Sequence, residues 1–236
     1  MSSNRVAIIG AGSWGTALAC ALSSAGETYV WSRDPGQVAS MEAKRHNPRY
    51  LSEIEIPKGV LFTADLADAV YRAPIVIMAV PAKAMLTTTR ALSGILRGQT
   101  GKGVEPPLVL SAAKGLDPES GRLMSQVLAE TLGDGAVVGA ISGPNIAREV
   151  AQGMPAATVI ACADGTRAAA ARGRISGPRL RAYTNEDVIG VEVGGAIKNV
   201  IAIGTGICDG LQAGDNAKAA IITRGLAEMT LSLIHI

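Results

Sequence analysis

Histidine and aromatic residues are scarce in this sequence. The chain of 236 residues contains only two histidines, His46 and His235. This argues against a multi-histidine metal site and against a Ser-His-Asp triad. Proton transfer, if there is any, would fall to a lysine or a carboxylate. Aromatic residues make up only 3% of the chain, so its core must be built from aliphatic side chains.

Cysteine and net charge are also low. Cys20, Cys162 and Cys208 are widely spaced, which indicates neither a disulfide framework nor a zinc site, and we expect no metal. The net charge of +2 gives no basis for binding nucleic acid or an anionic membrane. No apolar run reaches about 18 uninterrupted residues, and the N-terminus lacks a signal-peptide pattern. We therefore expect a soluble, cytoplasmic chain without a membrane segment.

Aliphatic runs alternate with helical patterns along most of the chain. RVAIIG, TYVWS, APIVIMAV, PLVLSAA, AVVGAIS and AATVIAC are predicted strands. Near-continuous hydrophobic strands that alternate with helices are typical of a parallel sheet covered on both faces. After about residue 187 the pattern becomes helical. We predict a Rossmann-type, doubly wound α/β domain at residues 1–187 and the start of an α-helical C-terminal domain at 188–236.

A glycine-rich loop follows the first predicted strand. Gly10, Gly12 and Gly15 have the G-x-G-x-x-G spacing, and a helical pattern that ends near Gly26 follows them. In this motif the first glycine allows a tight turn, the second a close approach to a pyrophosphate, and the third close helix–strand packing. The helix N-terminus then presents free amides to the phosphates. The loop predicts a dinucleotide site.

The second predicted strand ends in Ser32, Arg33 and Asp34. At this place an acidic residue binds the ribose 2′-hydroxyl of NAD, whereas an arginine accommodates the 2′-phosphate of NADP. Arg33 favours NADP. In the alternative interpretation Arg33 lies in solvent and Asp34 holds the ribose, which would favour NAD. Both cofactors remain open, with NADP favoured.

Polar or stiff residues follow three further strands. Pro81 ends one of them, Lys114 follows the next, and Gly143 and Asn145 follow a third. Each could be an ordinary turn or solvent residue. Because ligands of open α/β sheets bind beyond the carboxyl ends of the strands, the convergence of the three at one edge predicts a site.

Lys198 lies in the apolar stretch GVEVGGAIKNVIAIGTGICDG, residues 190–210. If this stretch is helical, its neighbours are small or aliphatic and leave room for a ligand or another backbone: Gly194, Gly195, Ile201 and Ala202. In one interpretation the ammonium simply reaches solvent. In the other it lies near the sheet edge with Lys114, where two positive charges would attract a phosphorylated substrate. Such a lysine could protonate a carbonyl oxygen.

Several motifs together resemble one family. GAGSWGTALA, NPRYL, VPAKAM, AAKGLD, SGPNIAREVA, the stretch around Lys198 and DNAKAAIITRGLAEM occur in this order. Over about residues 5 to 229 they resemble the NAD(P)-dependent sn-glycerol-3-phosphate dehydrogenases of bacteria. The resemblance implies reversible reduction of dihydroxyacetone phosphate to sn-glycerol 3-phosphate for glycerophospholipid synthesis. It also implies a Rossmann domain, a helical domain and a homodimer.

The resemblance implies a role for each matching residue. The cofactor would be bound by the three glycines of the loop, Gly10, Gly12 and Gly15, and by Ser13, Trp14, Arg33, Lys114 and Ala147. Those that would bind the substrate are Lys114, Gly143, Asn145, Lys198 and Asn199. Lys198 would be the catalytic general acid and base.

The chain departs from the family pattern in two places. Ser52 stands where the family commonly has proline, and the family continues beyond residue 236 with a Gly-Asp motif and an Arg-Asn pair that grips the substrate phosphate. The final LSLIHI matches the translation of CTG TCT CTT ATA CAC ATC, which resembles a transposase-type sequencing adapter. We therefore expect a truncated chain with an artefactual tail at 231–236. A cofactor-binding fragment without turnover and a related Rossmann hydroxyacid dehydrogenase remain alternatives.

Overall fold

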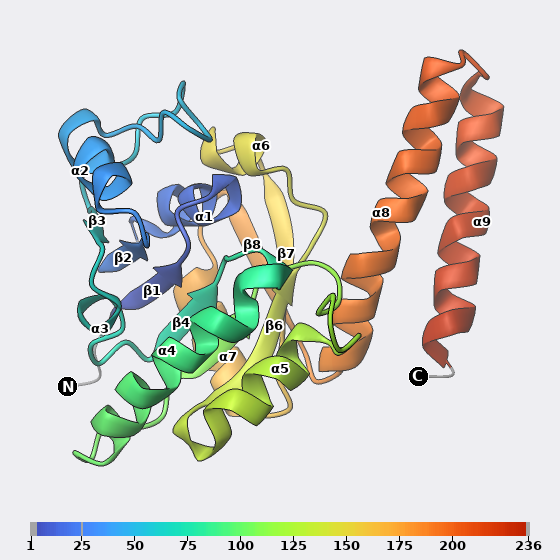
Figure 1. Cartoon of the computed structure of the whole chain (residues 1–236). Coiled ribbons are helices and arrows are strands. Elements are labelled where there is room, and N and C mark those ends of the chain that lie inside the picture. Colours follow the sequence, from blue (N-terminus) through green and yellow to red (C-terminus); the bar gives the residue numbers. More distant parts are fainter. Residues whose placement is uncertain (1–3, 25, 235–236) are drawn as a thin grey trace.

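The computed structural model describes residues 4–24 and 26–234. Its centre is an eight-stranded sheet in the order β3-β2-β1-β4-β5-β6-β7-β8 (Figure 1). All neighbouring strands are parallel except β6 and β7, which are antiparallel. The strands are β1 (Val6–Ile9), β2 (Thr28–Trp31), β3 (Val60–Thr63), β4 (Ile75–Met78), β5 (Leu108–Ser111), β6 (Val137–Ser142), β7 (Ala156–Ala161) and β8 (Leu180–Asn185).

Helices cover both faces of this sheet. The helices are α1 (Ser13–Leu22), α2 (Pro35–Lys44), α3 (Leu66–Ala69), α4 (Ala82–Thr100), α5 (Met124–Leu132), α6 (Ala147–Ala151), α7 (Gly165–Ile175), α8 (Val188–Gly210) and α9 (Asp215–Ile234), with a short 3-10 turn η1 (Gly133–Gly135). The predicted Rossmann-type, doubly wound and mostly parallel fold is thereby confirmed.

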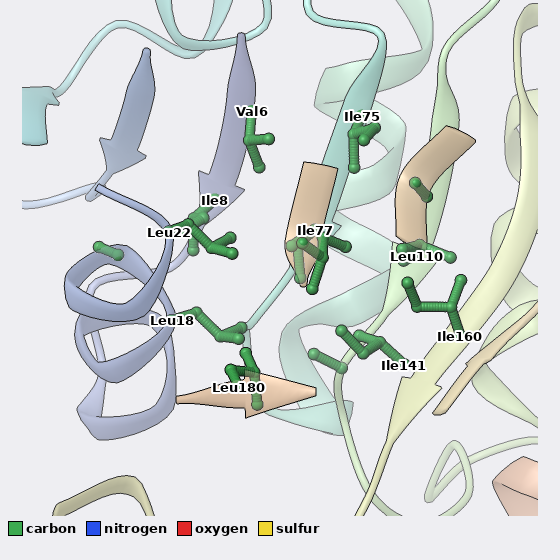
Figure 2. Close-up of a cluster of buried hydrophobic side chains, with 14 of the residues drawn as sticks. Val6, Ile8, Leu18, Leu22, Ile75, Ile77, Leu110, Ile141, Ile160 and Leu180 are labelled. Carbon is green, nitrogen blue, oxygen red and sulfur yellow. The ribbon is translucent and has the colours of Figure 1, made fainter. Parts of the chain in front are cut away.

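The central strands are hydrophobic throughout because both of their faces are covered. Val6 and Ile8 of β1 belong to a core cluster with residues of α1 and α7. Ala7 and Ile9, which point to the other face, belong to a second cluster with residues of α4 and α5. Figure 2 shows the first cluster, in which Leu18 and other aliphatic side chains fill the space beside β1 and β4. This arrangement explains the unbroken aliphatic runs.

The two edge strands, β3 and β8, are not among the strands predicted from the sequence. The sequence of β8, LRAYTN, alternates buried and exposed residues at its start and ends in three exposed ones. An edge strand faces solvent on one side, so it lacks the aliphatic run by which the central strands were recognised. The predicted end of the first helix near Gly26 is also wrong, since α1 ends at Leu22 with Ser23 as its C-cap.

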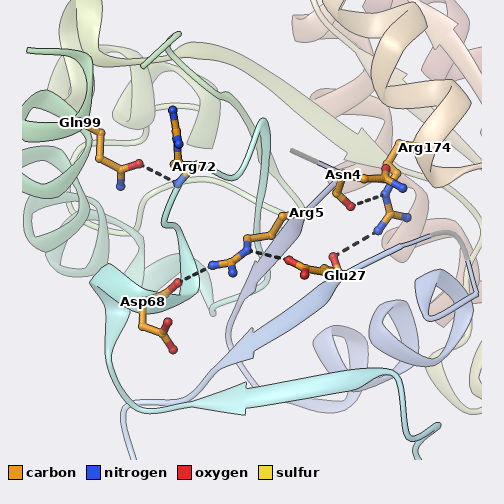
Figure 3. A network of polar contacts seen from close by, with 7 residues as sticks. All are labelled: Asn4, Arg5, Glu27, Asp68, Arg72, Gln99 and Arg174. Atoms are coloured by element: carbon orange, nitrogen blue, oxygen red, sulfur yellow. Dashed lines mark hydrogen bonds and ion pairs between the residues drawn. The ribbon is translucent and has the colours of Figure 1, made fainter. Parts of the chain in front are cut away.

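Polar contacts fix the beginning of β1 to its neighbours (Figure 3). Arg5 donates to the backbone carbonyl of Asp68 at 2.9 Å and to the carboxylate of Glu27 at 3.3 Å. The guanidinium of Arg174, a buried residue of α7, donates to the carbonyls of Asn4 at 3.2 Å and Glu27 at 3.3 Å. These bonds lie at the amino ends of the strands, so they stabilise the sheet and leave its carboxyl edge free.

The last two helices form a hairpin beside the sheet. α8 and α9 pack along each other, and α8 contacts β6 and β7 (Figure 1). Contact within the hairpin is close at Gly225, where an added Cβ would lie 2.7 Å from the side chain of Ile201. The helix expected around Lys198 is thus confirmed and runs from Val188 to Gly210. Of the six residues predicted to be an artefactual tail, 231–234 continue α9, while 235 and 236 lie outside the described residues.

α8 is long and apolar enough, by length and composition, to cross a membrane, with a mean hydropathy of 1.4. It also carries two ionisable residues that bond to the sheet domain. Glu192 accepts a hydrogen bond from Ser125, and Lys198 donates one to Gly143. Packing against the sheet domain therefore accounts for these two ionisable residues of the helix.

Candidate functional site

A cavity of about 700 Å³ opens at the carboxyl ends of β1, β2 and β4. β1 lies between β2 and β4, so the strand order reverses at this place. Ligands of such folds bind at this switch point. Its volume suits a small-molecule site, which typically measures about 300–1,000 Å³. Among its lining residues are the predicted Gly10, Gly12, Ser13, Trp14, Arg33, Lys114, Asn145 and Ala147.

Each of the three motif glycines is explained by a different steric requirement at its position. Gly10 has φ +121°, and an added Cβ would lie 2.7 Å from the carbonyl oxygen of Ala79. A Cβ on Gly15 would lie 1.9 Å from the carbonyl oxygen of Gly10, so this glycine lets α1 approach the loop and does not line the cavity. A Cβ on Gly12 would meet nothing within 4 Å. The space beside Gly12 therefore belongs to the cavity.

The N-terminus of α1 faces this cavity without a cap of its own. Its N-cap residue is Gly12, which makes no side-chain hydrogen bond, and its first turn contains no acidic residue. The first amides of a helix have no intrahelical partner, and the helix dipole makes this end partly positive. The loop and helix start therefore fit the pyrophosphate of a dinucleotide.

Asn47 holds the glycine loop in place and was not identified from the sequence. Its side chain is completely buried. Its Nδ2 donates to the carbonyl oxygen of Ala11 at 2.9 Å and to the hydroxyl of Thr16 at 2.8 Å. Gln37 donates to the same carbonyl at 2.9 Å. The NPRYL motif contains Asn47, so this motif was the signal, but only the tertiary contacts reveal what the asparagine does.

At the end of β2 the structure separates the two residues considered for cofactor choice. Asp34 is the N-cap of α2, and its Oδ1 accepts hydrogen bonds from the amides of Gly36 at 2.9 Å and Gln37 at 3.2 Å. Pro35 occupies the first helical turn, where a missing amide costs no intrahelical bond. Arg33 is exposed and lines the cavity. One oxygen of Asp34 thus accepts hydrogen bonds from the start of α2, whereas the guanidinium of Arg33 does not cap this helix.

Two further cationic side chains line the cavity. Arg49 and Lys83 do so together with Arg33 and Lys114, while Asp34 is the one acidic residue among the described residues that line it. Arg49 lies in NPRYL and Lys83 in VPAKAM. Both motifs were noted in the sequence, but neither residue was assigned a role. The excess of positive charge makes the cavity favourable for an anionic ligand.

The side chain of Lys198 binds to a backbone carbonyl at the edge of this cavity. Its half-buried Nζ donates to the carbonyl oxygen of Gly143 at 2.8 Å. Burial and, after it, the charge and hydrogen bond of the neighbouring Lys114 lower the pKa of Lys198. The ammonium is thus bound to the protein, as the interpretation that places it near the sheet edge with Lys114 expects. Lys198 does not line the cavity itself but adjoins Lys114, which does.

The turn after β6 is rigid where it meets Lys198. A Cβ on Gly143 would lie 2.6 Å from the carbonyl oxygen of Ala157. Asn145 donates through Nδ2 to that carbonyl at 2.8 Å and through its backbone amide to Gly143 at 2.9 Å. The carbonyl of Gly143 thus accepts from both Asn145 and Lys198. Predicted residues from two distant parts of the chain meet at this turn.

The small residues beside Lys198 serve mainly for packing. A Cβ on Gly195 would lie 2.6 Å from Oγ of Ser142, and one on Gly194 would lie 3.8 Å from Met229 of α9. The sequence left a ligand or another backbone as occupants of this space, and at Gly195 the structure instead shows the side chain of Ser142. Asn199 is exposed and does not line the cavity, so the structure does not bring it together with the other predicted residues.

Within residues 4–24 and 26–234, no group of three or more His, Cys, Asp or Glu side chains is arranged to hold a metal ion. Cys20 and Cys162 are set apart from the cavity, and burial raises the pKa of the Cys20 thiol to about 11. That value makes Cys20 a poor nucleophile at neutral pH. The site residues that could transfer a proton are therefore the lysines.

Comparison with known proteins identifies the family. Residues 5–168 match the family described as NAD-dependent glycerol-3-phosphate dehydrogenase N-terminus, and residues 187–235 match the corresponding C-terminus. A glycerol-3-phosphate dehydrogenase (NAD(P)+) of Thiobacillus denitrificans is 43% identical over 226 residues, which are 96% of this chain and 66% of the relative. One of Stenotrophomonas maltophilia is 41% identical over 97% of this chain and 65% of the relative.

A solved structure agrees with these matches. The crystal structure of a glycerol-3-phosphate dehydrogenase from Coxiella burnetii superposes with a TM-score of 0.84 at 36% identity and covers 98% of this chain and 68% of that one. This chain spans slightly less than two thirds of the length of the curated relatives described above. The matches cover the glycine loop and the helix of Lys198 alike, and the chain belongs to the NAD-dependent glycerol-3-phosphate dehydrogenase family.

Proposed function

We propose that this chain carries the cofactor site and the catalytic lysine of an NAD(P)H-dependent dehydrogenase. The reaction would be the reversible reduction of dihydroxyacetone phosphate to sn-glycerol 3-phosphate, which supplies glycerophospholipid synthesis in the cytoplasm. The observation that carries the proposal is the position of Lys198, which binds the carbonyl of Gly143 next to Lys114 at the edge of the cavity that the glycine loop lines. Names of the curated relatives support it. The division at residues 187 and 188 and a homodimer are part of the same proposal.

Residues of the glycine loop would hold the cofactor. The amides at the start of α1 fit its pyrophosphate, and Ser13, Trp14 and Ala147 line the same cavity. When bound, the nicotinamide supplies the hydride. The uncapped helix end and the open space beside Gly12 support this assignment.

Lys198 would transfer the proton that accompanies the hydride. An ammonium has three N–H donors, and one of them is engaged by the carbonyl of Gly143. A further N–H remains available to a substrate carbonyl oxygen, to which Lys198 would donate its proton. Its lowered pKa makes it a better acid than an ordinary lysine and brings it closer to the operating pH. In the reverse direction the neutral amine would take the proton from the alcohol.

Lys114 would attract the phosphorylated substrate. It is exposed, lines the cavity and lies next to Lys198. Two adjoining positive charges favour a dianionic phosphate over a neutral substrate. Gly143 and Asn145 build the turn against which such a substrate would lie, and Asn199 remains a proposed contact through the family resemblance alone.

We propose NADP(H) as the preferred cofactor, with Arg33 as the residue that selects it. Replacing Arg33 by alanine should raise the Kd for NADPH about tenfold, because a hydrogen bond to a charged group contributes about 1.5–3 kcal/mol and exposure of Arg33 weakens this. The Kd for NADH should change little, since NADH lacks the 2′-phosphate. Tryptophan fluorescence titration with both cofactors measures this. Equal weakening of NADPH and NADH would contradict the selective role.

The proposed reaction is tested by following NADPH oxidation by this chain with dihydroxyacetone phosphate. Oxidation that depends on this substrate supports the proposal. Oxidation only with unphosphorylated keto acids would identify a related hydroxyacid dehydrogenase instead. Saturable NADPH binding without oxidation of any of these substrates would identify a cofactor-binding fragment without turnover.

A further inference from the structure

Glu192 is a buried carboxylate that joins two distant helices. It is one of two buried residues on α8, the other being Gly195, and only 7% of Glu192 is exposed. Its Oε1 accepts a hydrogen bond from the backbone amide of Ser125 at 3.0 Å, and its Oε2 accepts one from the hydroxyl of Ser125. Ser125 belongs to α5, which precedes β6 and β7 in the sequence, whereas α8 follows them. The contact therefore links the hairpin to the sheet domain.

The carboxylate occupies the place of a helix cap. α5 begins at Met124 with Leu123 as its N-cap residue, and a leucine has no side-chain acceptor. The amide of Ser125 is one of the first amides of this helix, which have no intrahelical partner. Glu192 accepts from it and places a carboxylate at the positive end of the helix dipole. Another helix thus supplies the cap that α5 lacks.

Burying the carboxylate of Glu192 costs free energy, so its presence needs a role that an apolar side chain could not fill. Burial raises the pKa of Glu192, and the hydrogen bonds from Ser125 act in the opposite direction. No lysine or arginine within the described part of the chain forms an ion pair with it. Apolar residues often replace buried charges without loss of stability. A directional bond that fixes one helix on another is what a leucine at this position would not provide.

Three contacts at intervals of three residues hold α8 on the sheet domain. Glu192 bonds to Ser125, Gly195 packs against Ser142, and Lys198 bonds to Gly143. Glu192 and Lys198 are six residues apart, or about 9 Å along the helix axis. The first contact is directional and buried, and the second is only steric. The orientation of Lys198 thus depends on the bond that Glu192 makes six residues earlier in the same helix.

We propose that Glu192 is a positioning residue, which fixes α8 through the N-terminus of α5 and so holds the ammonium of Lys198 beside Gly143 and Lys114. The significance of this placement for catalysis rests on the proposed function. Without the carboxylate, α8 keeps α9 as its main partner and loses its buried polar contact with the sheet domain. Lys198 then moves away from Lys114, and its amine becomes more basic.

The environment of Lys198 tests this without any turnover. The intact chain is labelled with acetic anhydride over a range of pH, and the extent of modification at Lys198 is measured by mass spectrometry beside a lysine peptide in the same reaction. In Glu192→Ala the pH midpoint should shift upward, toward that of the peptide. Glu192→Gln, which keeps one oxygen for the amide of Ser125, should restore most of the original midpoint.

Asp187→Ala is the matched control, because Asp187 caps the same helix through Gly190 at 2.7 Å but makes no bond to α5. It should leave the midpoint of Lys198 unchanged. An unchanged midpoint in folded Glu192→Ala, or an equal shift in Asp187→Ala, overturns the proposal. If Glu192→Ala does not fold, Ser125→Ala removes the hydroxyl donor alone, and an unchanged midpoint there overturns it as well.

Turnover gives a second readout where the wild-type chain is active. Glu192→Ala should then lower kcat about tenfold to a hundredfold, because small misplacements of a catalytic group have effects of this size. The Kd for NADPH should not change, because Glu192 does not line the cavity. A wild-type chain without turnover would count against the proposed function, while the labelling midpoints would still decide the role of Glu192.

Discussion

Replacing Lys198 by alanine should lower kcat for reduction of dihydroxyacetone phosphate by about 10²–10⁴-fold, the usual contribution of a general acid. The variant loses the ammonium that is held at the carbonyl of Gly143 and whose pKa Lys114 lowers. The Kd for NADPH should remain within about twofold, since Lys198 does not line the cofactor cavity. Steady-state kinetics and a fluorescence titration on the same preparations measure both quantities.

The pH profile gives a further signature of Lys198. The lysine must be protonated to donate, so reduction should be lost as the pH rises through its pKa. Because burial and Lys114 lower that pKa, the loss should begin at a lower pH than an ordinary lysine would cause. Lys218→Ala is a matched control: its ammonium on α9 pairs with Asp209 at 2.6 Å, away from the cavity. Turnover that survives Lys198→Ala undiminished would rule out the catalytic role.

Replacing Gly15 by alanine should destabilise the fold by about 3 kcal/mol, at the upper end of the range for overpacked positions. The added Cβ would lie 1.9 Å from the carbonyl oxygen of Gly10, a backbone atom that cannot rotate away. For a chain of this size such a loss lowers Tm by about 6–12 °C. Thermal unfolding followed by circular dichroism measures this, and the Kd for NADPH should rise in the same variant because the loop is displaced.

Gly12→Ala provides the contrast within the same motif. An added Cβ meets no atom of the protein within 4 Å, and φ is −80°, which alanine adopts without strain. Its stability should change by less than about 1 kcal/mol, the scale of a modest change at an N-cap. Its Kd for NADPH should nevertheless rise at least about tenfold, or 1.4 kcal/mol, because the methyl group occupies the approach to the pyrophosphate. Equal stability losses in the two variants would contradict these separate roles.

The central strands were predictable because they are buried on both faces. Each residue of β1 is completely buried, so its sequence is aliphatic at every position and the run is visible by itself. β8 escaped recognition for the opposite reason, since an edge strand is apolar on one side only. The order of the strands and the reversal at β7 depend on contacts between segments far apart in sequence, which no local pattern encodes.

Part of the site was predictable for a similar reason. The spacing of Gly10, Gly12 and Gly15 is a local requirement of one turn, and the sequence displays it completely. Lys198 was conspicuous because a charge in an apolar helix needs a partner. The partner itself was not local: the structure identifies the carbonyl of Gly143 as the acceptor and places the like charge of Lys114 beside it.

The sequence by itself determined the fold class and marked the glycine loop and Lys198 as candidate site residues, because periodicity, glycine spacing and an isolated charge are properties of short segments. Only the tertiary structure decided which groups those segments meet. It assigned an oxygen of Asp34 to capping α2, gave the space beside Gly195 to Ser142, and placed the carboxylate of Glu192 on α5. Burial and hydrogen bonding between distant segments depend on packing, and packing exists only once the chain has folded.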